Sequence, residues 1–422
     1  MKTEFDAVII GGGPAGSSAA ILLARAGWAV ALIEKQDFPR RKVCGECVAA
    51  SNLPLLEALG IGAMFAQVAG PELRQVALVH GAYTVVAELP AAPNAQHPWG
   101  RALGRETLDT LLIAQARLAG VHVMQPWSAT RITGTAANWR CDVRATHSGT
   151  LLTLRAAVLI DAHGSWQALP GARAGRSRVH RAADLLAFKA NFREARLPEG
   201  LLPVLAFQGG YGGMVKAGGG ITTLACCIRR DQLEAGRRAA PGSSAGEVIE
   251  ALLQEQCGAV KTALQGATRE GAWLAAGPLD TGIHLHPGDA VFRIGNAAGE
   301  AHPILGEGMS MALQSAWLLC AQLLTRTPGA GLSDPVWQRE MARVYAAQWH
   351  DAFATRLRLA AVLAHGAMRP WLLKPVLALL QRWPSLLTRA AAWGGKTRCV
   401  ADPAAVAQQN TFCNPAMRQQ GA

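Results

Sequence analysis

The most informative chemical pattern in this sequence is a glycine-rich turn near the N-terminus, at positions 11–16. The apolar run Phe5–Ile10 precedes it, and an Ala- and Leu-rich run at helical spacing follows over Ser17–Ala26. Strand, glycine turn and helix in this order are typical of a dinucleotide site, where the glycines permit the bend and a close approach of the backbone to a pyrophosphate. The residues we assign to this site are Gly11, Gly13, Pro14, Ala15 and Gly16.

An acidic residue stands where such a site needs one. A second apolar run, Trp28–Ile33, predicts the next strand and ends at Glu34. A carboxylate there accepts hydrogen bonds from ribose hydroxyls and repels a 2′-phosphate. We therefore expect the ADP half of FAD or NAD rather than NADP.

A basic and thiol-containing segment follows. Arg40, Arg41 and Lys42 would serve a pyrophosphate, although a solvated charged loop is an equal alternative. Cys44 and Cys47 form a C-x-x-C pair without a second pair for zinc and without thioredoxin-like surroundings. His284 and His286, placed on one face of a predicted strand, lack a third ligand, so no metal site is predicted.

A second glycine-rich block lies late in the chain. A predicted strand over 290–294 runs into Gly295–Gly308, and a long apolar helix follows directly. Small residues before a helix start suit an anionic or electron-rich ligand held by backbone N–H groups.

These segments together resemble the FAD-dependent oxidoreductases built on the p-hydroxybenzoate hydroxylase fold. Within that superfamily the chain is similar to the branch of geranylgeranyl reductases, flavin-dependent halogenases and monooxygenases. The resemblance covers about residues 4–325. It rests on the N-terminal turn, Lys42–Glu46, Arg105–Asp109, and the late block, which matches G-D-A-A-x(4)-P-x-x-G-x-G in spacing.

The resemblance implies FAD as cofactor, with the ADP on the first turn and the flavin on the late block. The further residues it assigns to FAD are Glu34, Lys35, Arg41, Lys42, Arg105, Gly164, Gly295, Asn296, Pro303, Gly306, Glu307, Gly308 and Met309. Asn296 replaces the usual Asp but keeps an acceptor oxygen. His163 replaces another family Asp, which leaves either NAD(P)H or a separate flavin reductase as electron source.

Three residues are candidates for catalysis. The resemblance places Cys44 and Glu46 near the flavin, and a small buried thiol is the alternative for Cys44. His302 would lie at the reactive face as a general base on a phenol or enol, and a structural histidine is its alternative.

The expected activity is a monooxygenase of secondary metabolism that hydroxylates an aromatic or polyketide-like hydrophobic substrate. The alternative is reduction of carbon–carbon double bonds in an isoprenoid or other lipid. Halogenation is less favoured because no lysine lies between Lys42 and Lys189. A non-catalytic flavoprotein that docks an acyl carrier protein is a further alternative.

The expected fold is α/β, with a Rossmann-like FAD-binding domain, an inserted α+β substrate domain and a helical C-terminus. The predicted divisions are 1–80, 100–175 and 276–330 for FAD, 81–99 and 176–275 for the substrate sheet, and 331–422 for the helical region. The 422 residues suffice for two or three such units.

Composition limits the partners. The net charge is +12, but the basic residues are scattered, so no nucleic acid is expected. Nine cysteines and no secretory leader favour the cytoplasm.

Residues 308–325 are long enough for a membrane span but carry polar residues, which favours a buried helix. Helices expected over 356–367 and 371–389 mix Leu, Val and Trp with Arg and Lys, the pattern of burial or of peripheral contact with the inner face of a membrane. A carrier-bound substrate, a flavin reductase partner, and a monomer or dimer stay open.

Overall fold

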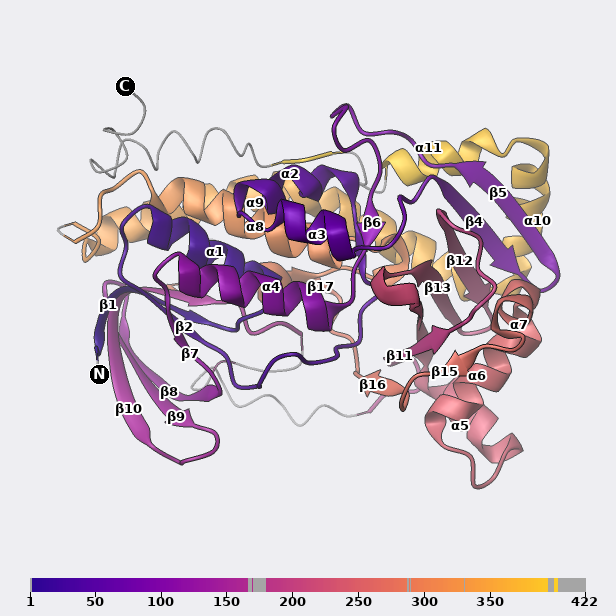
Figure 1. Cartoon of the computed structure of the whole chain (residues 1–422), viewed down its shortest axis with the longest axis horizontal. Coiled ribbons are helices and arrows are strands. Elements are labelled where there is room, and N and C mark those ends of the chain that lie inside the picture. The colour runs from indigo at the N-terminus through magenta and orange to yellow at the C-terminus, as the bar shows by residue number, and fades with distance from the viewer. Residues whose placement is uncertain are drawn as a thin grey trace.

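The computed structural model describes residues 2–165, 169, 180–286, 288, 290–329, 331–393 and 398–400. Two large β-sheets lie side by side along the long axis, with helices packed against both (Figure 1). The predicted α/β class is confirmed. The domain boundary predicted at 175 and the polar tail after 402 lie outside the described residues.

The first sheet has the order β7-β2-β1-β10-β9-β8, with β18 also paired to β10. Its central strands are parallel, whereas β9 runs antiparallel to β10 and β8. The strands are β1 (Glu4–Ile10), β2 (Val30–Ile33), β7 (His122–Met124), β8 (Trp127–Thr135), β9 (Asn138–Ala145), β10 (Leu151–Asp161) and β18 (Phe292–Arg293).

Three helices cover this parallel part: α1 (Pro14–Arg25), α4 (Arg105–Leu118) and α8 (Gly308–Leu323). Their buried apolar side chains form one core with β1, β2 and β10. Pro14 stands at the first position of α1, where its missing N–H costs no helical hydrogen bond. The carboxyl ends of β1 and β10 meet beside the start of α1, which is where open α/β sheets bind ligands.

The second sheet has the order β15-β11-β14-β13-β12-β4-β5, with β16 paired to β11. It begins at Gln75, before the predicted boundary at 80, because β4 pairs with β12 and β5. The strands are β4 (Gln75–His80), β5 (Tyr83–Glu88), β11 (Leu185–Arg193), β12 (Leu201–Phe207), β13 (Gly210–Lys216), β14 (Thr222–Arg229), β15 (Thr268–Arg269) and β16 (Leu274–Ala276).

Helices cover both faces of the second sheet. On one face, α5 (Arg230–Ala239), α6 (Ala245–Gln256) and α7 (Gly258–Leu264) share a core with the strands. On the other face, the end of α9 (Pro335–Ala367) and α10 (Pro370–Arg382) pack on β5, β13 and their neighbours. Alternate residues of each strand therefore enter different cores.

The C-terminal helices differ from the sequence expectation at one point. The helix predicted over 371–389 is divided into α10 and α11 (Ser385–Trp393). Pro384 explains the break, because proline lacks an N–H and disfavours helical backbone at the preceding residue. No helix in the described part of the chain has the length and apolar character needed to cross a bilayer.

Short elements connect these layers. His284 and His286 follow β17 rather than share a strand face, which corrects the sequence-based placement. The short elements are β3 (Cys47–Val48), η1 (Ala50–Asn52), α2 (Leu53–Ala58), α3 (Gly62–Val68), β6 (Arg101–Ala102), η2 (Gly218–Gly220), β17 (Gly282–Ile283), η3 (Gly295–Ala297), β19 (Gly299–Glu300) and η4 (Pro303–Leu305).

Candidate cofactor and active site

The glycine turn is closed tightly against the end of β10. Gly11 has φ +110°, and a Cβ at this position would lie 2.3 Å from the carbonyl oxygen of Ala162. A Cβ on Gly16 would lie 1.9 Å from the carbonyl oxygen of Gly11. Both positions therefore require glycine. Gly13 is the N-cap residue of α1. A Cβ added to Gly13 would lie 3.6 Å from Nη2 of the Arg105 guanidinium.

Glu34 is buried beside this turn. Its carboxylate accepts hydrogen bonds from the N–H of Gly12 at 3.0 Å and of Gln36 at 2.9 Å. Arg40 Nη2 lies 3.4 Å from Glu34 Oε2. The acidic residue thus holds the position at the end of β2 that a ribose-binding carboxylate requires.

Cations gather in front of the start of α1. Arg105 forms a two-point ion pair with buried Asp109, at 2.7 Å on each side, and Arg40 lies 3.8 Å from the same carboxylate. Lys42 is half-buried; burial, and then the charges of Arg105 and Arg40, lower its pKa to about 8. Lys42 Nζ also lies 3.2 Å from where a Gly164 Cβ would stand. This excess positive charge at a helix N-terminus fits a pyrophosphate.

The affinity for FAD is expected to fall as the pH rises above about 8. A phosphate favours the protonated lysine and raises its pKa, so Lys42 contributes to binding below pH 8 and progressively less above it. Lys42→Met should weaken binding about tenfold at pH 7, the equivalent of one pKa unit, and remove this pH dependence. Fluorescence titration of FAD measures both.

Lys35→Met is the matched control, since Lys35 is exposed. An equal loss of affinity in the two lysine variants would contradict a direct role for Lys42.

Two predicted FAD residues lie apart from this cluster. The Lys35 side chain is exposed. Arg41 Nη2 lies 2.9 Å from Oε1 of Glu270, the residue that follows β15 of the second sheet. Arg40, which the sequence analysis named only as one of three basic residues that would serve a pyrophosphate, lies between Glu34 and Asp109 and reaches both carboxylates. Three consecutive basic residues in a loop carry no periodic signal for which one points inward.

The late block packs against the first turn. Gly295 has φ +60°, donates its N–H to Ser315 Oγ at 2.8 Å, and would place a Cβ 3.0 Å from the Cβ of Ala15. Asn296 Nδ2 donates to Ser165 Oγ at 2.6 Å. The two glycine motifs, far apart in sequence, are therefore adjacent at one edge of the sheet.

The end of the block starts α8. Pro303 is exposed, Gly306 adopts φ +65°, and Gly308 has no atom of the described residues within 4 Å of a Cβ position. The Glu307 carboxylate is buried 3.5 Å from Arg356 Nη1. Met309 packs into the core of the first sheet. The open surface at Gly308, next to the α8 N-terminus, suits an electron-rich ring.

Glu46 is buried in an ion pair with Lys189 of β11. Its carboxylate also accepts from Thr223 Oγ1 of β14 at 2.5 Å and from the N–H of Arg105 at 3.1 Å. Its φ is +59°, a conformation that side chains rarely adopt. The structure thus places this predicted catalytic carboxylate among polar contacts that link the segment before α4 to β11 and β14 of the second sheet. It lies outside the cavity that His302 lines. Sequence reasoning missed Lys189 and Thr223.

Cys44 lies beside the FAD cluster. Its Sγ accepts from the Glu46 N–H at 3.3 Å and hydrogen-bonds the Arg105 side chain. Among the described residues, neither Cys44 nor Cys47 is in a disulfide. The described residues contain no cluster of His, Cys, Asp and Glu that could hold a metal ion.

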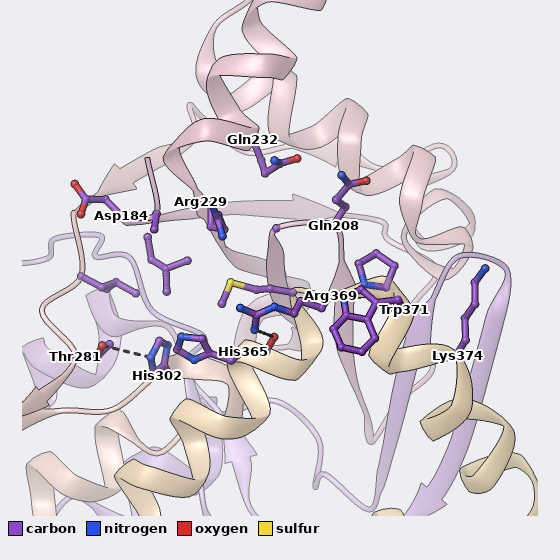
Figure 2. Close-up of a pocket in the computed structure, with 16 residues that line it drawn as sticks. Asp184, Gln208, Arg229, Gln232, Thr281, His302, His365, Arg369, Trp371 and Lys374 are labelled. Atoms are coloured by element: carbon purple, nitrogen blue, oxygen red, sulfur yellow. Dashed lines mark hydrogen bonds between the residues drawn. The ribbon is translucent and has the colours of Figure 1, made fainter. Parts of the chain in front are cut away.

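His302 lines a cavity of about 920 Å³ (Figure 2). The cavity lies between the start of β11, the β12–β13 turn and the α9–α10 corner. Tyr211 Oη lies 3.1 Å from His302 Nδ1, and Thr281 Oγ1 lies 3.3 Å from Nε2. His365 faces His302 with 5.7 Å between ring centroids. The structure brings His302 to this cavity, whereas Cys44 and Glu46 lie outside its lining.

The His302 ring is neutral at physiological pH. Burial, and then the nearby His365, lower its pKa to about 4. Burial also raises the pKa of Tyr211 well above its usual value, so this hydroxyl stays protonated. One nitrogen of the ring then accepts a hydrogen bond and the other donates one.

Acid is expected to destabilise the protein through His302. The unfolded chain binds a proton at this histidine near pH 6.5 and the folded chain only near pH 4, so stability falls as the pH drops through that window. The loss approaches about 3 kcal/mol. Urea unfolding at pH 7 and pH 4.5 should show a smaller difference for His302→Gln than for the parent.

His147→Gln, at an exposed site, is the control. The same acid sensitivity in His302→Gln and in the parent would contradict the assignment.

A glycine turn with a ribose carboxylate, a cation cluster at a helix start and a second glycine block against it define a flavin-binding oxidoreductase of the Rossmann type. The chain belongs to the FAD-binding domain family, whose sequence profile matches residues 4–335. The predicted superfamily is thereby confirmed, and FAD is the cofactor. The cation cluster, the turn and the open side of Gly308 fit this group.

Known proteins extend this assignment. The menaquinone reductase of Mycolicibacterium smegmatis is 27% identical over 382 residues, which cover 86% of this chain and 85% of the relative. Two solved structures share the fold. The myxobacterial chondrochloren halogenase CndH has a TM-score of 0.71 at 17% identity and covers 98% of this chain and 97% of its own. PqsL from Pseudomonas aeruginosa, described as a probable FAD-dependent monooxygenase, has a TM-score of 0.68 at 18% sequence identity. The match covers 89% of this chain and 100% of the PqsL chain.

Proposed function

We propose that the protein is an FAD-dependent reductase that saturates a carbon–carbon double bond in a hydrophobic substrate with an oxygen-bearing head, such as an isoprenoid quinone. The observation that carries this proposal is the neutral Tyr211–His302 pair at the cavity. The likeness to a menaquinone reductase over most of both chains supports it.

The protonation states favour donation over proton abstraction. A histidine whose pKa is about 4 is a weak general base at pH 7 and would take little proton from a phenol. In the tautomer in which Nδ1 accepts from Tyr211, the Nε2–H of His302 is directed towards Thr281 and the cavity. His302 then donates to a carbonyl or hydroxyl oxygen of the substrate and fixes its position.

Held by the glycine turn, the cations beside it and the start of α8, reduced FAD would supply hydride chemistry for one carbon of the double bond, and a proton from solvent or a protein donor would complete the single bond. The cavity volume lies within the usual range for small-molecule sites, about 300–1,000 Å³. Leu185, Leu279 and Met368 provide apolar lining for the hydrocarbon part.

Hydroxylation of an aromatic substrate is the second candidate. The same apolar lining accommodates a ring, and His302 could hold a phenolic oxygen without deprotonating it. Halogenation has less support because Lys189, the first lysine after Lys42, is paired with Glu46 and lies outside the cavity lining.

Isotope and mass measurements separate the candidates. The FAD-loaded protein is incubated with a short-chain menaquinone under argon, with NADH, NADPH or a separate flavin reductase as electron source. The proposal predicts a product that, after reoxidation of any quinol to the quinone, is heavier by two hydrogens and carries no added oxygen. A product that forms only in air and carries ¹⁸O from ¹⁸O₂ would replace reduction with hydroxylation.

A further inference from the structure

The C-terminal helices carry positive charge without any negative charge. Between Asp351 and Asp402 the sequence has no acidic residue and eight Lys or Arg residues, whereas the whole chain has a net charge of +12. Lys374, Arg382 and Arg389 are exposed on α10 and α11. Most of the surplus charge of the protein is therefore concentrated in this segment.

Helix α10 is apolar on two opposite faces. Leu373, Leu377 and Leu380 are buried against the second sheet. Trp371 and Leu379, on the other side of the helix, are 69% and 45% exposed. A helix that is apolar all round normally has both faces covered.

Further large side chains extend this exposed face. Trp383 is 52% exposed and Trp393 on α11 is 77% exposed. Tyr83, 59% exposed, belongs to β5, which contacts both α10 and α11. These elements lie side by side at the upper right of Figure 1. We name this surface the tryptophan face: Tyr83, Trp371, Lys374, Leu379, Arg382, Trp383, Arg389 and Trp393.

We propose that the tryptophan face docks the protein onto an anionic membrane surface. Trp and Tyr favour the boundary between lipid headgroups and acyl chains, and exposed Lys and Arg are attracted to anionic headgroups. A second copy of the chain fits less well. Apposed C-terminal helices would bring basic residues together without acidic partners from the same segment.

The cavity opens next to this face. Trp371 and Lys374 belong both to the tryptophan face and to the cavity lining (Figure 2). Docking would bring the cavity mouth to the lipid surface, so a membrane-resident substrate could enter without crossing water. This last step rests on the proposed function, whereas docking itself does not.

Vesicle flotation of the oxidised holoprotein tests the docking. Vesicles of phosphatidylcholine mixed with phosphatidylglycerol should carry the protein upward, and vesicles of phosphatidylcholine alone much less. Each basic residue near such a surface strengthens binding about fivefold. R382E/R389E should therefore lower binding to the anionic vesicles by at least about tenfold, whereas R237E/R238E on α5 makes the same charge change at another exposed site and should not.

The aromatic side chains are tested separately. W383A/W393A should weaken binding, and L118A, at an exposed leucine of α4, should not. Bound flavin and the melting temperature verify that each variant is folded. Absence of flotation, or equal losses in R382E/R389E and R237E/R238E, would overturn the proposal. The proposal would also be overturned if R382E/R389E and W383A/W393A left vesicle binding unchanged and altered only the molecular mass of the protein in solution. That result would identify the face as a contact between copies of the chain. No turnover is needed, so failure of docking and failure of the proposed reaction are separate results.

Discussion

Replacement of Lys189 by methionine is expected to lower the free energy of unfolding by about 3–5 kcal/mol, the usual cost of removing one partner of a buried ion pair. Lys189 and Glu46 are both almost fully buried. Without the ammonium, the Glu46 carboxylate keeps two partners among the described residues, the Thr223 hydroxyl and the Arg105 N–H. Urea unfolding measures the loss.

The same variant should also lose FAD. Glu46 holds the N–H of Arg105 at the start of α4, and the Arg105 guanidinium faces the glycine turn. A shifted Glu46 would therefore displace a cation of the pyrophosphate cluster. The flavin absorbance of the purified protein reports this effect independently of stability.

A second substitution distinguishes an unpaired charge from lost packing. The double variant Lys189→Met/Glu46→Gln retains an acceptor oxygen for the Arg105 N–H, while the Thr223 hydroxyl keeps Asn191 Oδ1 as an acceptor at 3.2 Å. It leaves no unpaired charge at this site, so it should recover most of the stability. A double variant as unstable as Lys189→Met would show that the ammonium contributes through packing and not through the ion pair.

The sequence predicted the parts of the site that are local in the chain. Phe5–Ile10, the glycine turn and Glu34 follow one another at fixed spacing, and the structure places them together as expected. The late block was recognisable for the same reason. Its contact between Gly295 and Ala15 could be expected only through the resemblance, because no periodicity links residues so far apart.

The non-local partners could not be predicted. Glu46 and Lys189 are separated by 143 residues, and a single lysine in an apolar strand gives no indication of its partner. His302 meets Tyr211 and His365 only because the late block, β13 and the end of α9 converge. This convergence lowers the pKa of His302 and so changes its expected role from base to donor.

Gly16→Ala is expected to weaken FAD binding strongly and to destabilise the fold. The added methyl group would stand 1.9 Å from the Gly11 carbonyl oxygen and 3.1 Å from the Ala162 Cβ, so the helix must move away from the turn. Overpacking of this kind costs about 3 kcal/mol. The displaced N–H groups at the start of α1 would lose charge-assisted hydrogen bonds to phosphate, about 1.5–3 kcal/mol each. FAD affinity should fall about 100-fold, as measured by fluorescence titration.

Gly45→Ala is the matched control, because this exposed glycine lacks a left-handed φ and has no atom from the described part of the chain within 4 Å of a Cβ position. It should bind FAD and unfold like the parent.

Gly308→Ala gives an intermediate case. The added methyl group has room beside α8 and should leave the free energy of unfolding unchanged, but it would enter the surface assigned to the flavin. If Gly308→Ala binds FAD as tightly as the parent does, the flavin does not lie against the start of α8, even where Gly16→Ala loses it.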